Sequence, residues 1–283
     1  MQYKEGSLFF SASDLTAYLD SPFASWMDRY ALECPGGEVA PDEIESMDRL
    51  LFAKGYKHES EVEAALQQEF DTFIAIDGKG DAEKIANTRA ALEAGIDVVT
   101  QACFRVGQFF GYADFLIKVP GKSRLGDYHY EVWDAKLSKR AKPSHALQLC
   151  LYVDMLESIQ GRKPDRVVVA LGSGERHPIP LSECYAYYQS VREDFLAVQE
   201  QFDPNQQPDP AAFNSWGRWS DYAKEILLER DHLYQVANIT REQIKKLNRV
   251  GIETMAGLAA TSVDKVPGIG QPVFERLKVL ICT

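Results

Sequence analysis

The segment Glu131-Val132-Trp133-Asp134-Ala135-Lys136 is the stretch on which the interpretation of this chain depends. Its aromatic and β-branched residues are typical of a strand, in which side chains two residues apart point to the same side of a sheet. Asp134 and Lys136 therefore share one face, and Trp133 and Ala135 share the other. The sequence predicts an acid and a base side by side on one strand.

A second acidic residue precedes this strand in the segment Gly111-Tyr112-Ala113-Asp114. If the strand that carries Asp114 is a neighbour, the carboxylates of Asp114 and Asp134 converge on a hard cation such as Mg²⁺ or Mn²⁺. The backbone carbonyl of Ala135 and water oxygens would complete the ligand shell. Lys136 is then placed to orient a water molecule and to offset charge that develops on a phosphoryl group. These are the ingredients of phosphodiester hydrolysis.

The segments around this pair have the periodicity of an α/β protein. Strands are expected between residues 102 and 136, with a turn-rich connector at 120–127, and again at 166–171. The Pro-rich segment 203–210 is a linker or surface loop that ends the sheet-bearing part. Helical spacing and capping residues predict helices at 13–19, 41–70, 81–99, 143–159 and 182–201.

The order of these motifs resembles that of the PD-(D/E)XK nucleases, in particular their RecB-like and CRISPR-associated exonuclease branch. In that branch an acidic residue follows a Gly-containing bend, as Asp114 follows Gly111. An acid-x-Lys strand follows a hairpin, as Asp134 and Lys136 do here. The resemblance extends over about residues 11–200 and implies a restriction-endonuclease-like α/β core, in which a mixed central sheet is flanked by helices.

The resemblance also assigns roles to residues beyond the acid-lysine strand. Gln148 and Tyr152 match a Gln-x-x-x-Tyr helix, and their spacing puts both on one helical face, which in the family points at the active site and substrate. Gly55-Tyr56-Lys57-His58-Glu59 is similar to a Gly-to-His motif whose His binds metal, although the spacing is one residue shorter. His58 is therefore a further candidate metal ligand.

A plainer interpretation of the same residues stays open. Asp114 would end a turn, Asp134 and Lys136 would form a surface ion pair, and Gln148 and Tyr152 would belong to an ordinary amphipathic helix. His58 would then be a solvated side chain on a Glu-rich helix.

Many members of that branch carry four cysteines that bind an iron-sulfur cluster and pin the two ends of the nuclease core together. Here Ser21-Pro22 stands where the first cysteine is expected, and residues 213–222 contain none. The chain is therefore expected to bind no iron-sulfur cluster. Packing of Trp26, Trp216 and Trp219 is expected to replace it.

A short basic run follows the acid-lysine strand. Lys139, Arg140 and Lys142 lie just beyond Lys136, where the phosphates of a substrate would pass, and they are candidates for DNA contact. The alternative is that they are only the solvated side chains of a loop.

The last part of the chain contains Lys265-Val266-Pro267-Gly268-Ile269-Gly270-Gln271, which resembles the turn of a helix-hairpin-helix motif. Gly268 and Gly270 would let backbone amides approach a phosphate at a helix N-terminus, without reading the bases. Residues 244–259 look like a more degenerate copy. We therefore expect a nuclease domain at 1–235 and a small all-α DNA-binding module at 236–283. A protein-binding helical hairpin is the alternative for this module.

Composition restricts where the protein acts and how it meets DNA. The 283 residues carry a net charge of −11, so any contact with DNA must be local. Residues 238–283 have a net charge of +3, which leaves −14 for the remainder. No apolar run approaches the roughly 20 residues that cross a bilayer, and no secretory signal is evident. With five scattered cysteines, these features predict a cytoplasmic protein with reduced thiols and no membrane partner.

Together these observations predict a Mg²⁺- or Mn²⁺-dependent deoxyribonuclease that acts on single-stranded or end-bearing DNA in repair, recombination or defence. A RecB-like core followed by a helix-hairpin-helix motif also resembles the N-terminal part of large bacterial nuclease-helicase proteins. A helicase domain, in the same or a partner polypeptide, is therefore an expected partner. The alternative function is a non-catalytic DNA-binding or scaffold module, which the intact acid-x-Lys pair disfavours.

Overall fold

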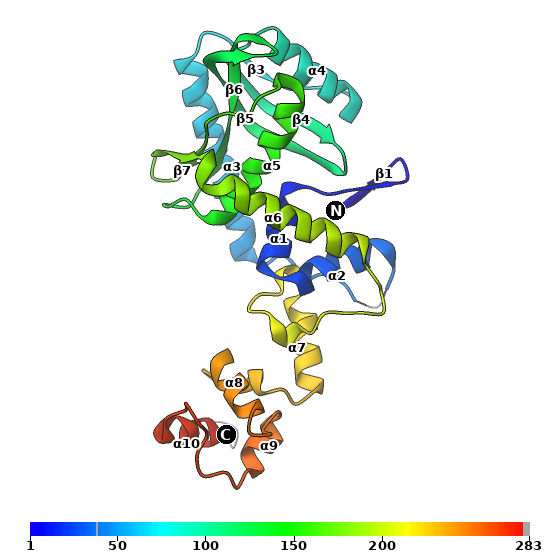
Figure 1. Cartoon of the computed structure of the whole chain (residues 1–283), viewed down its shortest axis with the longest axis vertical. Helices are drawn as coiled ribbons and strands as arrows, with labels where there is room; N and C mark the ends of the chain where they lie inside the picture. The colour runs from blue at the N-terminus through cyan, green and yellow to red at the C-terminus, as the bar shows by residue number, and fades with distance from the viewer. Residues whose placement is uncertain (38, 280–283) are drawn as a thin grey trace.

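The computed structural model describes residues 1–37 and 39–279 and is built around a mixed six-stranded sheet (Figure 1). The strand order is β3-β4-β5-β6-β7-β8, with parallel pairing between β3 and β4 and between β6 and β7 and antiparallel pairing elsewhere. The strands are β3 (Phe73–Ala75), β4 (Val98–Val106), β5 (Phe109–Ser123), β6 (Gly126–Lys136), β7 (Arg166–Leu171) and β8 (Arg176–Pro180).

Helices cover both faces of this sheet. The larger hydrophobic core joins one face to four helices, α1 (Ala12–Asp20), α4 (Asp81–Glu93), α5 (Pro143–Gln160) and α6 (Leu181–Glu200). A smaller cluster joins the other face to α3 (Ser46–Glu69) through Leu66, Phe115 and Trp133. The mixed sheet between helices is the α/β arrangement that the sequence predicts. Two short strands, β1 (Gln2–Lys4) and β2 (Ser7–Phe9), pair with each other at the N-terminus.

The local signals for the first helices are satisfied in the structure. Ser11 and Asp14 form a reciprocal capping box at the start of α1, and α2 (Pro22–Glu33) begins at Pro22 with Ser21 as its N-cap. By contrast, α4 ends at Glu93, and the residues from Val98 onward belong to β4. The prediction of a helix through residue 99 was therefore wrong at its C-terminal end, because Gly95, with a φ of 72°, ends it.

The bend expected at Gly111 lies elsewhere. Gly111 sits inside β5 in regular register with Phe104, and an added Cβ there would come within 3.0 Å of the Tyr152 hydroxyl. The irregularity is three residues further along β5, at the unpaired position Asp114, which lies opposite Gln101, whose φ is 53°. Gly111 therefore makes room for a ring, and the irregularity in strand pairing lies at Asp114.

A tryptophan cluster connects the two ends of the sheet-bearing part. Trp26 in α2 packs with Trp216 and with Trp219 at the end of the 3-10 helix η2 (Gly217–Trp219), just before α7 (Ser220–Glu229). Each indole N–H has an acceptor, and that of Trp219 donates to Asp28 Oδ1 at 2.8 Å. The predicted packing of these three tryptophans is confirmed.

The C-terminal helices α8 (Arg241–Asn248), α9 (Met255–Ala260) and α10 (Gln271–Val279) form a group at the end of the molecule away from the sheet (Figure 1). They enclose their own hydrophobic cluster, which runs from Leu233 to Leu277. This cluster begins in the 3-10 helix η3 (Leu233–Gln235), slightly before the boundary expected at residue 236. In the part of the chain that the structure describes, no helix combines the length and the apolarity needed to cross a membrane.

Candidate metal and phosphodiester site

The two predicted carboxylates meet where the ladder between β5 and β6 ends. The last regular pair is Phe115 with Trp133, and one step further Asp114 stands opposite Asp134. There Asp114 Oδ2 accepts a hydrogen bond from the backbone N–H of Ala135 at 3.3 Å, in place of a ladder carbonyl. The end of strand pairing thus places both carboxylates together.

Lys136 is the cation of this group. Its ammonium donates to Asp134 Oδ1 at 3.0 Å and lies 2.8 Å from Oδ2. The two residues are two apart on β6 and share one face, as alternation along a strand requires. Asp134 is only 2% exposed, so the plainer interpretation of a surface ion pair does not fit this pair.

Burial and charge both disfavour the ionised form of Asp134. Its burial is the larger cause of a pKa well above the usual range, the nearby charge of Asp114 raises the pKa further, and Lys136 opposes both effects. Asp134 is thus close to a second carboxylate and to a single ammonium. A site with surplus negative charge of this kind is suited to a divalent cation.

The helix α5 presents Gln148 and Tyr152 to the same place. Gln148 Nε2 donates to Asp134 Oδ1 at 3.4 Å, and the Tyr152 hydroxyl lies against Gly111. Burial, followed by the charges of Asp114 and Asp134, raises the pKa of Tyr152, so its hydroxyl keeps its proton and can donate it in a hydrogen bond.

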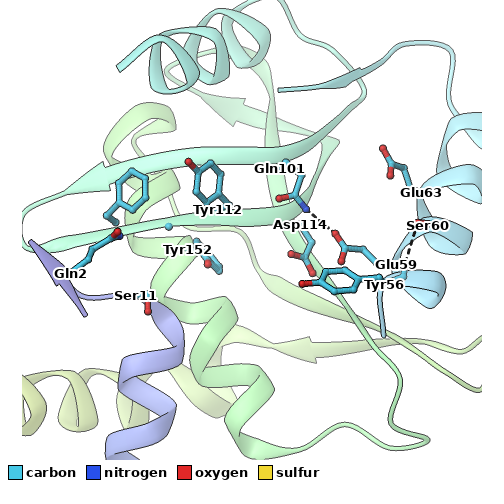
Figure 2. Close-up of a pocket in the computed structure, with 12 residues that line it drawn as sticks. Gln2, Ser11, Tyr56, Glu59, Ser60, Glu63, Gln101, Tyr112, Asp114 and Tyr152 are labelled. Carbon is cyan, nitrogen blue, oxygen red and sulfur yellow. Dashed lines mark hydrogen bonds between the residues drawn. The ribbon is translucent and has the colours of Figure 1, made fainter. Parts of the chain in front are cut away.

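A cavity of about 570 Å³ opens beside these residues (Figure 2). Tyr152 and Asp114 form part of its wall, whereas Asp134 and Lys136 do not line it. The wall on the side of α3 carries Tyr56, Glu59 and Glu63, and Gln101 contributes from β4. Polar groups from a helix and from the sheet therefore face one open space.

Glu59 is the residue that sequence reasoning missed. It faces the cavity from α3 and accepts a hydrogen bond from Gln101 Nε2 at 2.7 Å (Figure 2). Burial raises its pKa most, and the charges of Asp114 and Glu63 raise it further. Glu59 and Glu63 are four residues apart, so they share a helical face, and this spacing was the available signal.

The side chain of His58 points toward β7 and away from the two carboxylates. Its Nε2 lies 3.0 Å from the carbonyl oxygen of Ala170 on β7, and it lines a separate hollow beside the turn between β7 and β8. Successive residues of a helix point about 100° apart, so His58 and its neighbour Glu59 cannot both face the carboxylates. The structure thus does not bring His58 to Asp114 and Asp134, and Glu59 occupies the position facing them.

The basic run lies in the loop between β6 and α5. Lys139, Arg140 and Lys142 are all exposed. The carbonyl of Arg140 accepts a hydrogen bond from Ser138, and the amide of Lys142 donates to His145 Nδ1 at 3.2 Å. Backbone contacts therefore hold the loop next to the end of β6, while its charged groups face solvent.

The donors at this site fit a hard divalent cation. Asp134 Oδ2 is fully buried and accepts no well-aligned hydrogen bond from the described residues, although the Lys136 ammonium lies 2.8 Å away as an ion-pair partner. Carboxylate oxygens of Asp114 and Asp134 and the carbonyl of Ala135 are the ligand type that Mg²⁺ and Mn²⁺ prefer. Within residues 1–37 and 39–279, no three His, Cys, Asp or Glu side chains are clustered closely enough to hold a metal by themselves.

The sequence matches no model of a known protein family, and a search of curated proteins finds no match. The function is therefore inferred from the geometry of the site.

Proposed function

We propose that this protein is a metal-dependent nuclease of the PD-(D/E)XK type that hydrolyses phosphodiester bonds of DNA. The observation that carries the proposal is the meeting of Asp114, Asp134 and Lys136 at the end of the β5–β6 ladder, beside an open cavity. An acid-x-Lys strand paired with a second acidic strand is the arrangement that this chemistry requires.

Different residues of the chain have different roles in hydrolysis. Asp114, Asp134 and the carbonyl of Ala135 would hold a Mg²⁺ or Mn²⁺ ion, which when bound lowers the pKa of water and polarises a phosphoryl oxygen. Lys136 orients the attacking water and offsets charge that develops on the phosphoryl oxygens. Gln148 and Tyr152 donate hydrogen bonds that orient the substrate.

Removal of metal is the direct test of this function. Labelled single-stranded DNA should be cut in the presence of Mn²⁺ and left intact in excess chelator. Asp134→Asn should lose cleavage with Mn²⁺ present, because an amide holds a cation poorly, while Asp127→Asn, at an exposed carboxylate in the β5–β6 hairpin, should cut normally. Cleavage that survives chelation or Asp134→Asn would contradict the proposal and favour a scaffold role.

The C-terminal helices support a contact with the DNA backbone. Gly251 and Gly268 have almost equal φ angles, 82° and 79°, and each is followed by a buried isoleucine, Ile252 or Ile269. The two turns between α8 and α9 and between α9 and α10 therefore resemble two copies of one hairpin. We infer that residues 236–283 act as a helix-hairpin-helix module.

The second hairpin is the better candidate for the phosphate contact. At the first one, the Asp231 carboxylate accepts a hydrogen bond from the amide of Ala256 at 2.8 Å and so occupies the start of α9. At the second, none of the described residues accepts a hydrogen bond from the amide of Gly270 or Gln271. Those amides remain open to an anion at the start of α10.

A side chain at Gly270 tests this contact without disturbing the fold. An added Cβ there meets no atom within 4 Å, whereas at Gly268 it would press on Lys246. Gly270→Val should therefore fold normally and bind single-stranded DNA more weakly. The slope of log affinity against log salt concentration should become shallower by about 0.7 for each phosphate that is no longer bound. The measurement is DNA affinity at several salt concentrations.

Gly80→Val is the matched control, because Gly80 is equally open and precedes a helix of the sheet-bearing part. Its affinity and salt dependence should equal those of the unmodified protein. If Gly270→Val also leaves both unchanged, the module is better explained as a protein-docking element.

A further inference from the structure

We propose that Phe52 and Tyr56 form a stacking platform for unpaired bases next to the cleavage site, an inference that rests on the proposed nuclease function. Both lie on α3, the helix that also supplies Glu59 to the cavity. The occupant would be a single-stranded segment of the nucleic acid, whose bases are free to leave their own stack.

The first support is position on the helix. Phe52, Tyr56, Glu59 and Glu63 are spaced by four, three and four residues, so they form one stripe along α3. Tyr56, Glu59 and Glu63 line the cavity that contains Asp114 (Figure 2). The aromatic stripe therefore leads directly into the carboxylate site.

The second support is exposure. Tyr56 is 72% exposed and Phe52 is 56% exposed, although large aromatic side chains usually bury most of their surface. Four residues of helix separate the rings by about 6 Å along the axis, which leaves each ring open to a base of its own. The described residues thus leave Tyr56 uncovered at the cavity and Phe52 uncovered one helical turn away, where it lines a separate hollow with Asp48 and Lys224.

Charge indicates which part of a nucleic acid would face α3. Glu59 and Glu63 make this side of the cavity acidic and would repel phosphates, whereas Lys136 ends β6 and the exposed Lys139 lies in the loop that follows this strand. A strand entering the site would therefore turn its phosphates toward β6 and its bases toward α3. Stacking on an aromatic ring accepts any base, so this platform would select unpaired strands without reading sequence.

Binding measurements test the platform separately from cleavage. The probe is a short single-stranded DNA that carries the fluorescent base 2-aminopurine, bound to full-length protein with the cleavage-blocking Asp134→Asn substitution. Phe52→Ala and Tyr56→Ala should each weaken binding by roughly tenfold, and the fluorescence change on binding should shrink. Tyr56→Phe keeps the ring and should bind as the parent does.

Met47→Ala and Leu50→Ala are the matched controls, because these side chains are exposed on the other face of the same helix. Both variants should leave the affinity for DNA unchanged. A DNA probe with an abasic nucleotide at the stacking position should bind Tyr56→Ala and its parent with equal affinity. Unchanged affinity in both ring variants would overturn the platform. Equal losses in the Met47 and Leu50 controls would also overturn it, because they would show that the effect is not specific to the two rings.

Cleavage by the unsubstituted chain, measured in parallel, separates the two proposals. If it cuts DNA while ring removal changes neither binding nor cleavage, only the platform fails. If ring-dependent binding occurs without any metal-dependent cleavage, the nuclease function fails and the base contact stands.

Discussion

Lys136→Ala is expected to slow DNA cleavage by about 10²- to 10³-fold, which is the usual effect of removing one group that stabilises developing charge. Lys136 is held beside Asp134 by a hydrogen bond of 3.0 Å, and its side chain is 27% exposed, so it reaches the site without being free in solvent. The measurement is the single-turnover rate on labelled single-stranded DNA with saturating Mn²⁺.

Metal affinity separates the chemical role of Lys136 from a structural one. Because an ammonium next to a cation site repels the cation, Lys136→Ala should bind Mn²⁺ at least as tightly as the unsubstituted protein in a calorimetric titration. Lys139→Ala is the control for general loss of positive charge, since Lys139 is exposed in the following loop, and it should keep nearly the full rate. An unchanged rate in Lys136→Ala would remove this residue from the mechanism.

Trp219→Ala is expected to lower the free energy of unfolding by about 3–5 kcal/mol, the range for removing a buried Trp or Phe side chain. Trp219 is fully buried in the cluster that joins α2 to α7, and the substitution also leaves Asp28 without its indole donor. Denaturant unfolding followed by circular dichroism measures the loss.

Two further variants define what the tryptophan contributes. Trp219→Phe retains most of the apolar contact and should lose much less stability than the alanine variant. Tyr187→Ala removes an aromatic ring that is 51% exposed on α6 and should change stability by no more than about 0.5 kcal/mol. A loss below about 1 kcal/mol in Trp219→Ala would show that the cluster does not hold the two segments together.

Local pattern was enough to predict the centre of the site. The alternation along β6 put Asp134 and Lys136 on one face, and the helical spacing of Gln148 and Tyr152 put both on one side of α5. Both inferences concern periodicity within one element, and the structure brings these residues together as that periodicity requires.

Relations between elements were harder to predict. Whether His58 or Glu59 faces the carboxylates depends on the rotation of α3 about its axis. Packing of Leu66 against the sheet sets this rotation. The spacing of Glu59 and Glu63 indicates a shared helical face but not the direction in which that face points. The irregularity in strand pairing at Gln101 likewise depends on a non-glycine residue with a φ of 53°, which composition does not reveal. Strand β8 was missed because Arg176–Pro180 combines charged and proline residues that are rare in strands.

The tryptophan cluster has a consequence for the conditions in which the protein keeps its shape. The contact between α2 and the segment around α7 combines apolar side chains such as Phe23 and Leu227 with three indole rings, whose N–H groups donate hydrogen bonds to Asp28 and to backbone carbonyls. Contacts made by buried rings and their hydrogen bonds are screened by salt much less than contacts between exposed charges. The union of these two distant segments should therefore persist at salt concentrations that screen ion pairs on the surface.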